Sequence, residues 1–331
     1  MKKVLVSILA IFLTFSLLST SFGVYAGSAL PATSVVKIKS KPAGMVVKWK
    51  ARDGVEGYEI QYSTSKDFTK KTSGIWKVRN KNTYYTRLYN LEISKKYFVR
   101  VRTYKGSLNS KWSAPETVKT GKAKLIALTF DDGPGYNKKA SKKILDTLEK
   151  YNAKATFFIV GSTMKGNEKN IKKKVKLGME LGNHTINHKH YGKSVTASDI
   201  KKCSNKIYKL TGKYPTCFRS PGGSTTAAIR NECKKENMPL YYWSVDTKDW
   251  RDRNKNTVYN RVMKNVKDGD IILMHELYTT TAEALEKMVP VLCKKGYKLV
   301  TCEELVYAKT GKKPVAGQQY VNAKRIKNNT K

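Results

Sequence analysis

Alternating apolar and polar residues dominate the chain between residues 33 and 119. Runs at 45–49, 58–62 and 97–102 alternate with a period of two, and turn-forming residues separate them. Successive side chains of a strand point to opposite faces, so this pattern predicts strands with one buried face. About seven such strands form an antiparallel β-sandwich, and no cysteine is present in this segment to pin it.

The pattern changes at residue 125. Apolar runs typical of buried strands alternate there with helical stretches, and the runs lie at 125–130, 155–160, 240–245, 271–274 and 297–300. One helix is indicated by apolar residues at i, i+3, i+4 and i+7, namely Leu285, Met288, Val289 and Leu292. This alternation predicts a parallel α/β arrangement, in which reactive residues gather at the carboxyl ends of the strands.

The first 26 residues have the pattern of a secretory signal peptide. Lys2 and Lys3 precede an apolar run at 4–18, and small residues lead to a processing site near Ala26. A membrane anchor is the alternative, but the run is shorter than the ~20 residues that a spanning helix needs. We therefore expect an exported protein with no stable membrane insertion after cleavage, and a linker at 27–32.

Charge changes the picture of the partners. The chain has 65 Lys and Arg against 25 Asp and Glu, a formal charge of +40. The excess is +14 over residues 31–120, +17 over 121–307 and +7 over 308–331. Such a surface favours a polyanionic neighbour. Because export excludes nucleic acid as the expected partner, we expect anionic cell-wall polymers; a general richness in lysine is the alternative.

Two short segments bound the second half of the chain. Residues 120–123 are expected to be a linker, which leaves 124–307 as the α/β domain. Residues 308–331 are basic and polar, with Gly311, Pro314 and Gly317. We expect this segment to be a flexible tail.

Candidate chemistry lies where the apolar runs end. Asp131 and Asp132 follow the first run and precede Gly-Pro, although a plain turn also favours Asp-Gly-Pro. Residues 183–188 contain His184 and His188, two of the four histidines of the chain. Histidines at i and i+4 lie on one face of a helical turn and can hold one metal; a polar helix start is the alternative. His190 is out of phase and is left outside the site.

One aspartate with two histidines gives three ligands of mixed type. Three protein ligands leave a position open for water, which is typical of catalytic zinc. His275, Asp249 and Arg219 each follow a different apolar run. They complete a plausible acid–base set.

Taken together, these segments resemble the polysaccharide deacetylase family, also called the NodB-homology or carbohydrate esterase family 4 domain. The segments that carry the resemblance are 129–134, 184–188, 219–223, 249–250 and 273–275. The resemblance implies a distorted (β/α) barrel of seven or eight strands and metal-dependent removal of acetyl groups from carbohydrate. The first segment resembles a fibronectin type III domain through Trp49, residues 57–62, Leu91 six residues before Tyr97, and residues 113–115.

Roles in metal binding and proton transfer follow from the resemblance. Asp132, His184 and His188 match the metal ligands; zinc is expected, although such a site also accepts cobalt, nickel or manganese. The acid–base residues are Asp131 as general base, Arg219 as the residue that holds it, His275 as general acid and Asp249 as its partner.

The substrate pocket is also implied by the resemblance. Trp250 and Leu273 match the apolar pocket for the acetate methyl, and the backbone after Pro221 would stabilise an oxyanion. The sequence departs from the family at Gly222, where an aromatic residue is usual. This departure puts substrate preference in doubt more than activity.

Five cysteines lie in the second half of the chain, at positions 203, 217, 233, 293 and 302. In an exported protein they allow one or two disulfides, and the odd count leaves at least one thiol unpaired. Buried free thiols are the alternative, and no pairing is predicted.

The sequence therefore predicts a secreted, wall-associated, monomeric, metal-dependent deacetylase that acts on an N-acetylated glycan. Peptidoglycan N-acetylglucosamine is the expected substrate; chitin, poly-N-acetylglucosamine and acetyl-xylan remain open. The alternative from another class is a non-catalytic wall-binding protein. Such a protein would be free to lose ligands, base or acid, and none is missing here.

Overall fold

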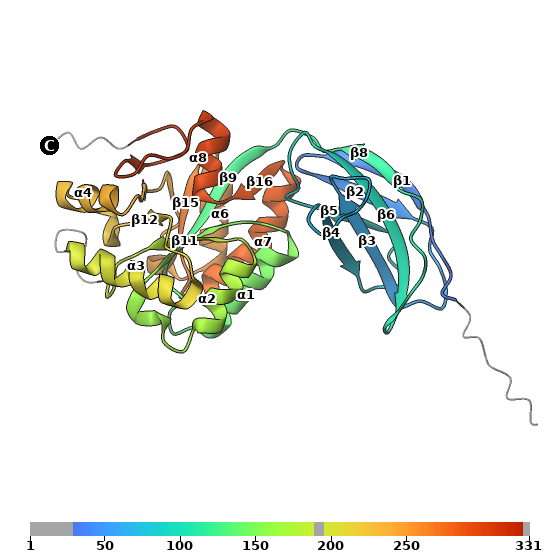
Figure 1. Cartoon of the computed structure of the whole chain (residues 1–331), viewed down its shortest axis with the longest axis horizontal. Helices are drawn as coiled ribbons and strands as arrows, with labels where there is room; N and C mark the ends of the chain where they lie inside the picture. The colour runs from blue at the N-terminus through green and yellow to red at the C-terminus, as the bar shows by residue number, and fades with distance from the viewer. Residues whose placement is uncertain (1–28, 189–194, 327–331) are drawn as a thin grey trace, which may run out of the picture.

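The computed structural model describes residues 29–188 and 195–326, which form two units side by side (Figure 1). The first unit is a sandwich of two antiparallel sheets, of order β1-β2-β5 and β4-β3-β6-β7, with β8 paired to β6. Its strands are β1 (Val35–Lys41), β2 (Gly44–Trp49), β3 (Gly57–Ser63), β4 (Ser73–Val78), β5 (Tyr85–Leu88), β6 (Lys96–Lys105), β7 (Leu108–Asn109) and β8 (Glu116–Lys119). The predicted sandwich is confirmed.

Alternate residues of the sandwich strands form one core. Trp49, Tyr58 and Val99 are buried in it, and the rings of Trp49 and Tyr58 lie 5.1 Å apart. Near Leu91, which is also buried, the Tyr97 hydroxyl accepts a hydrogen bond from the Glu92 amide at 3.2 Å. The spacing of Leu91 and Tyr97 in the sequence therefore corresponds to a real corner between two strands.

The second unit is a curled, wholly parallel sheet, of order β14-β15-β9-β10-β11-β12-β13-β17, with β16 on the first half of β9. Its strands are β9 (Lys124–Gly133), β10 (Thr156–Ile159), β11 (Glu180–Asn183), β12 (Cys217–Phe218), β13 (Leu240–Tyr241), β14 (Val245–Asp246), β15 (Ile271–His275), β16 (Tyr297–Val300) and β17 (Gln319–Tyr320). The predicted distorted barrel is confirmed. The described residues contribute nine strands to it, where seven or eight were expected.

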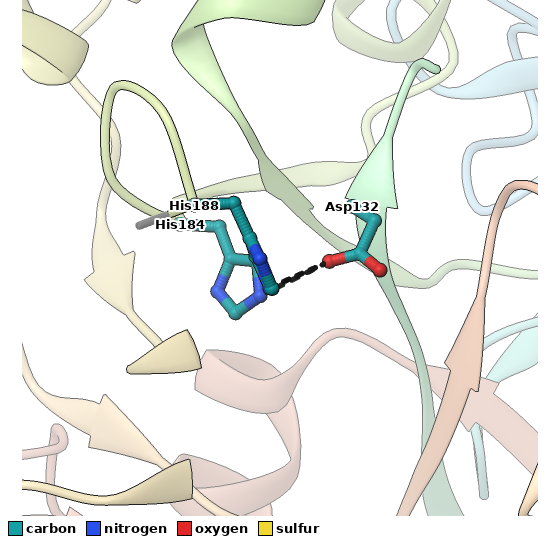
Figure 2. Close-up of side chains that lie close together, drawn as sticks. All are labelled: Asp132, His184 and His188. Carbon is teal, nitrogen blue, oxygen red and sulfur yellow. Dashed lines mark ion pairs between the residues drawn. The ribbon is translucent and has the colours of Figure 1, made fainter. Parts of the chain in front are cut away.

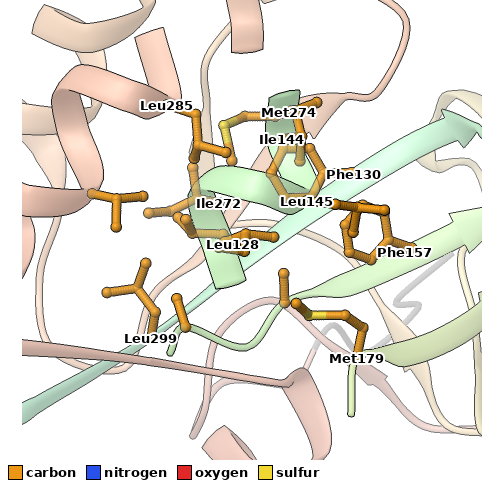
Figure 3. Close-up of a cluster of buried hydrophobic side chains, with 14 of the residues drawn as sticks. Leu128, Phe130, Ile144, Leu145, Phe157, Met179, Ile272, Met274, Leu285 and Leu299 are labelled. Carbon is orange, nitrogen blue, oxygen red and sulfur yellow. The ribbon is translucent and has the colours of Figure 1, made fainter. Parts of the chain in front are cut away.

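Helices surround this sheet (Figure 1). They are α1 (Lys138–Lys150), α2 (Glu168–Lys176), α3 (Ala197–Thr211), α4 (Ala227–Lys235), α5 (Asp249–Asp252), α6 (Lys255–Asn265), α7 (Thr279–Lys294) and α8 (Cys302–Thr310), with short 3-10 turns η1 (Gly161–Met164) and η2 (Pro221–Gly223). Figure 3 shows the main core, in which Leu128 and Phe130 of β9 meet Ile144 of α1 and Leu285 of α7. The predicted helix through Leu285 is confirmed as α7, with its apolar face buried.

One predicted strand is divided in two. The run at 240–245 yields β13 and β14, which lie near opposite ends of the strand order. Between them, the carbonyls of Tyr241 and Tyr242 accept hydrogen bonds from the Arg219 guanidinium at 3.0 and 2.8 Å. The apolar run alone gives no sign that Arg219, which is distant in the sequence, donates hydrogen bonds to these two backbone carbonyls.

The prediction of a flexible tail at 308–331 is wrong as far as residue 326. Strand β17 pairs in parallel with β13, and the Tyr242 amide donates to the Tyr320 carbonyl at 2.8 Å. Tyr320, Val321 and Ala323 are buried. An unpaired β13 would expose its backbone groups at a sheet edge. Pairing with β17 covers that edge. Residues 327–331 lie outside the described residues.

The two units are joined by a buried polar contact. Asn90 of the sandwich donates to the Tyr151 carbonyl at 2.7 Å and accepts from the Leu299 amide at 2.9 Å. Arg87 donates to the Cys293 carbonyl at 3.0 Å. Leu299 of β16 pairs with Ile126 near the start of β9, and Tyr151 and Cys293 lie at the carboxyl ends of α1 and α7. The sandwich therefore contacts the edge of the sheet where β9 begins.

Several predictions fall outside the described residues or remain open. The signal peptide (1–26), part of the linker at 27–32, and His190 lie in undescribed segments. No helix in the described ranges combines the length and apolar character needed to cross a membrane.

All five cysteines are described, and all are buried free thiols. Burial raises the pKa of Cys203 to about 12 and that of Cys293 to about 11.

Candidate active site

The carboxyl end of β9 carries the two adjacent aspartates. Residues 125–130 are buried, and Asp131 is buried with them, whereas Asp132 is only partly covered. Asp132 adopts φ +67°, a left-handed conformation that turns the chain sharply at this position. The turn gives the two carboxylates different neighbours.

The two histidines follow β11 in a loop, so the predicted helical turn is wrong. Thr185 and His188 have positive φ values of +69° and +52°. The Asn183 side chain accepts from the Thr185 amide at 2.8 Å, and the Thr185 hydroxyl accepts from the His188 amide at 3.0 Å. These local hydrogen bonds replace those of a helix. They still bring the rings of His184 and His188 to 5.0 Å.

Asp132, His184 and His188 converge on one point (Figure 2). Asp132 Oδ1 lies 3.4 Å from His184 Nε2 and 3.1 Å from His188 Nε2. His184 Nδ1 lies 2.6 Å from the Arg219 carbonyl oxygen. Because a carbonyl only accepts, Nδ1 carries a proton, and Nε2 is the ring nitrogen that faces Asp132. This is the hydrogen bond that usually orients a metal-binding histidine.

The donor set fits a divalent metal. One candidate ligand atom from each residue lies within 4.8 Å of the others. Asp132 Oδ1 is buried and receives no hydrogen bond from the described residues. Burial alone would raise the pKa of Asp132, but the facing imidazoles of His184 and His188 hold this pKa below its usual range. An ionised, buried oxygen between two imidazole nitrogens is suited to a cation.

Asp131 is held by Arg219. The guanidinium Nη1 donates to Asp131 Oδ1 at 2.7 Å and to the Thr129 hydroxyl at 2.7 Å. Arg219 is 1% exposed, and its guanidinium lies 4.2 Å from the centre of the Phe158 ring. These contacts fix the position of the Asp131 carboxylate beside a buried cation.

His275 and Asp249 form a second polar pair. His275 Nδ1 lies 2.7 Å from Asp249 Oδ1, and the His275 amide donates to Asp249 Oδ2 at 2.8 Å. Thr281 also donates to Oδ2, at 2.7 Å. Burial alone would lower the pKa of His275, but the hydrogen bond and the charge of Asp249 raise it to about 9. His275 is therefore a protonated imidazole near neutral pH.

Comparisons with known proteins agree with this geometry. The polysaccharide deacetylase model matches residues 118–241 and the fibronectin type III model matches residues 31–119. A peptidoglycan-N-acetylglucosamine deacetylase of Bacillus cereus is 36% identical over 205 residues, which are 59% of this chain and 92% of the relative. The chain belongs to the polysaccharide deacetylase family.

Other members of the polysaccharide deacetylase family set the limits of the similarity. Peptidoglycan-N-acetylglucosamine deacetylase PgdA of Listeria monocytogenes is 35% identical over 68% of this chain, which spans only 48% of that relative. The structure of peptidoglycan deacetylase PdaC from Bacillus subtilis is 37% identical, with a TM-score of 0.53 over 57% of this chain and 93% of that chain. The similarity in structure therefore concerns the barrel.

The predicted pocket residues of this member of the polysaccharide deacetylase family lie at the same edge of the sheet. Leu273 of β15 is buried, whereas Trp250 is 49% exposed and its amide donates to Asp249 at 2.9 Å. Pro221 and Gly222 form η2, where Gly222 adopts φ +63°. This conformation is readily available to glycine and costly for most side chains, which gives a physical reason for the missing aromatic residue.

Sequence analysis missed several residues of this edge. Thr129 stands within the first motif without an assigned role, yet its hydroxyl binds Arg219. Thr281 binds Asp249 from the start of α7, 32 residues further along the chain. A lone threonine in a helix gives no signal of such a contact. Lys174 and Glu276 form a fully buried ion pair next to His275, and no motif indicated it.

Proposed function

We propose that this protein is a metal-dependent deacetylase that hydrolyses the acetamido group of N-acetylglucosamine in peptidoglycan. This proposal rests mainly on one observation. Asp132, His184 and His188 converge beside Asp131, at the same sheet edge as His275. His184 Nε2 lies 3.8 Å from Asp131 Oδ2, and His275 is in register with Asp131 in the adjacent strands β15 and β9. The names of the Bacillus cereus and Listeria relatives support the choice of substrate.

A divalent metal held by Asp132, His184 and His188 would supply Lewis-acid polarisation of the carbonyl and a lower pKa for water. The chain itself handles the protons. Asp131, held in place by Arg219, accepts a proton from the attacking water. Protonated His275 donates a proton to the leaving amine, and Asp249 holds its ring in place through Nδ1. Acetate and a free amino sugar are the products.

The remaining predicted residues would bind the acetyl group. We assign its methyl to an apolar pocket made by Leu273 and Trp250. A backbone N–H of the turn at Pro221 and Gly222 would stabilise the developing oxyanion, since fixed donors contribute most where charge develops. Gly222 leaves this part of the site without an aromatic side chain.

We further propose that the metal is zinc and that the protein is exported, monomeric and retained at the cell wall by anionic polymers. Mixed nitrogen and oxygen ligands with open positions favour zinc. Cobalt, nickel and manganese are the alternatives that the experiment below compares with zinc. The excess of basic residues in both units supports wall retention.

Acetate release tests this proposal. The purified chain is assayed against peptidoglycan, chitin oligomers, poly-N-acetylglucosamine and acetyl-xylan, before and after chelation, and after adding back each metal. We expect release from peptidoglycan that is lost on chelation and restored most fully by zinc. Full activity in a verified metal-free sample would overturn the metal proposal. Binding to walls without acetate release would favour the non-catalytic alternative.

A further inference from the structure

A closed ring of hydrogen bonds adjoins the catalytic edge of the barrel, separate from the metal and acid–base residues. Lys174 Nζ donates to Asn170 Oδ1 at 2.6 Å and to Glu276 Oε1 at 2.7 Å. Asn170 donates to the Ser141 hydroxyl at 2.8 Å, and Ser141 donates to Glu276 Oε1. The ring therefore joins α1, α2 and the residue that follows His275.

The ring contains charges that are removed from water. The side chains of Lys174 and Glu276 are both 0% exposed, and no other lysine in residues 29–188 and 195–326 is so fully buried. The Lys174 ammonium lies 4.7 Å from the centre of the Phe157 ring. A buried ion pair contributes little stability compared with apolar residues of the same volume. Stability alone is thus a poor explanation for this pair.

Glu276 touches the catalytic segments in three ways. It follows His275 directly in the chain. Its amide donates to the Asp131 carbonyl at 3.0 Å. Its carboxylate packs against Gly133, where an added Cβ would lie 1.7 Å from Glu276 Oε2. One buried residue therefore contacts the loop of the general base and adjoins the general acid.

We propose that the Lys174–Glu276 pair fixes the position of His275 relative to Asp131, so that Lys174 and Glu276 are positioning residues. This inference rests on the proposed function, because both groups must act on the same amide bond. A misplacement of about 1 Å by a change outside the reacting groups can cost up to about 100-fold in rate. Ser141 belongs to α1, and Asn170 and Lys174 belong to α2. Because these helices hold the ring, it keeps the ends of β9 and β15 at a fixed separation.

The test is a charge-free double variant of the full chain, Lys174→Met with Glu276→Met. Unbranched methionines fill the volume of the pair without leaving an unpaired charge. We expect an unfolding temperature at or above that of the wild type, an unchanged KM for a chitin oligomer, and a kcat about 10–100-fold lower. A wild-type kcat in the folded double variant would overturn the inference.

A matched control separates positioning from general effects of buried carboxylates. Glu180 is also buried and accepts hydrogen bonds from Thr156 at 2.7 Å and Thr216 at 3.0 Å, but it lies at the amino end of β11. Glu180→Gln should lower the unfolding temperature and leave kcat unchanged, whereas Glu276→Gln should lower both. Equal effects of the two variants on kcat would contradict a positioning role.

Two further measurements keep the inference testable in every case. If the double variant does not fold, Ser141→Ala decides: a several-fold lower kcat supports the inference, and an unchanged kcat overturns it. If the wild type releases no acetate from any glycan, the proposed function fails, and hydrogen exchange of the backbone amide at position 276 decides instead. Faster exchange in the double variant supports positioning; equal exchange contradicts it.

Discussion

Arg219 serves two parts of the site at once. Its guanidinium holds the proposed base Asp131, and its carbonyl accepts a hydrogen bond from His184 Nδ1. One residue thus fixes the position of the proposed base and turns a proposed metal ligand towards Asp132. The family resemblance implies the first role. The second depends on a backbone atom, and residue identity says nothing about where a carbonyl points.

At the level of single residues, substitutions of Asp131 and Asp132 should have different effects. Asp131→Asn removes the proposed base and leaves Asp132 and the histidines in place, so kcat should fall about 10²–10⁴-fold. Bound metal, measured by elemental analysis, should stay at the wild-type level. Loss of metal from this variant would show that Asp131 is a ligand.

The pH profile should report the pair of His275 and Asp249. As general acid His275 must be protonated, so activity should fall as the pH rises through its pKa of about 9. Asp249 raises this pKa, and Asp249→Asn should therefore move the alkaline limb about 1–2 units towards lower pH. Thr281→Ala, which removes a neutral partner of Asp249, is the control and should move the limb much less. An alkaline limb that stays in place in Asp249→Asn would exclude His275 as the acid.

Among the secondary-structure elements, those with long periodic patterns were predicted best. Strand β9 is a continuous run of buried residues, and helix α7 buries residues at the expected helical spacing, so sequence alone places both elements. Short elements were placed less well. Residues 184–188 carry a spacing compatible with a helix, but the side chains of Asn183 and Thr185 accept hydrogen bonds from backbone amides and select a loop. Local competition of this kind leaves no periodic signal.

Strand β17 gives a prediction for the element that was mistaken for a tail. Tyr320 is 5% exposed and packs on Tyr241, with ring centres 5.9 Å apart. Tyr320→Ala should lower the free energy of unfolding by about 3 kcal/mol, as for other large aromatic residues removed from a core. Ile326→Ala, at a site that is 39% exposed, is the control and should change it by less than about 0.5 kcal/mol. Equal stability of both variants in urea would mean that β17 detaches in solution.

For the molecule as a whole, the contact between the two units was not predictable from the sequence. Asn90 lies in a stretch that resembles an ordinary turn, and its partners Tyr151 and Leu299 are 61 and 209 residues away. It also adopts φ +51°, which asparagine tolerates better than most residues. The family resemblances identified both units and were silent on how they meet.

Asn90 should therefore couple the stability of sandwich and barrel. Asn90→Gly keeps the positive φ and leaves the Leu299 amide and the Tyr151 carbonyl without their partner, at a cost of about 1–3 kcal/mol. Calorimetry should show one transition in the wild type and a broadened or divided transition in the variant. Asn82→Gly, at an exposed site of the sandwich, serves as control. A variant that melts like the wild type would show that Asn90 does not couple the two units.

Wall retention should depend on salt. Attraction between exposed charges is screened over ~8 Å at physiological ionic strength, so binding to isolated walls should weaken as salt rises. Hydrolysis of a small neutral chitin oligomer, followed in parallel by acetate release, should change little. Binding that is insensitive to salt would remove the role proposed for the net charge of +40.

The position of the sandwich decides where an anchored enzyme can work. Its contacts with Tyr151, Cys293 and Leu299 lie where the barrel strands begin, and the catalytic residues lie where they end. A polymer that holds the sandwich is thus separated from the catalytic residues by the full length of the barrel strands. Where the sandwich is the unit that is held, the proposed catalytic edge faces away from the point of attachment. The enzyme would then process neighbouring glycans, so that each point of attachment serves a surrounding area of wall.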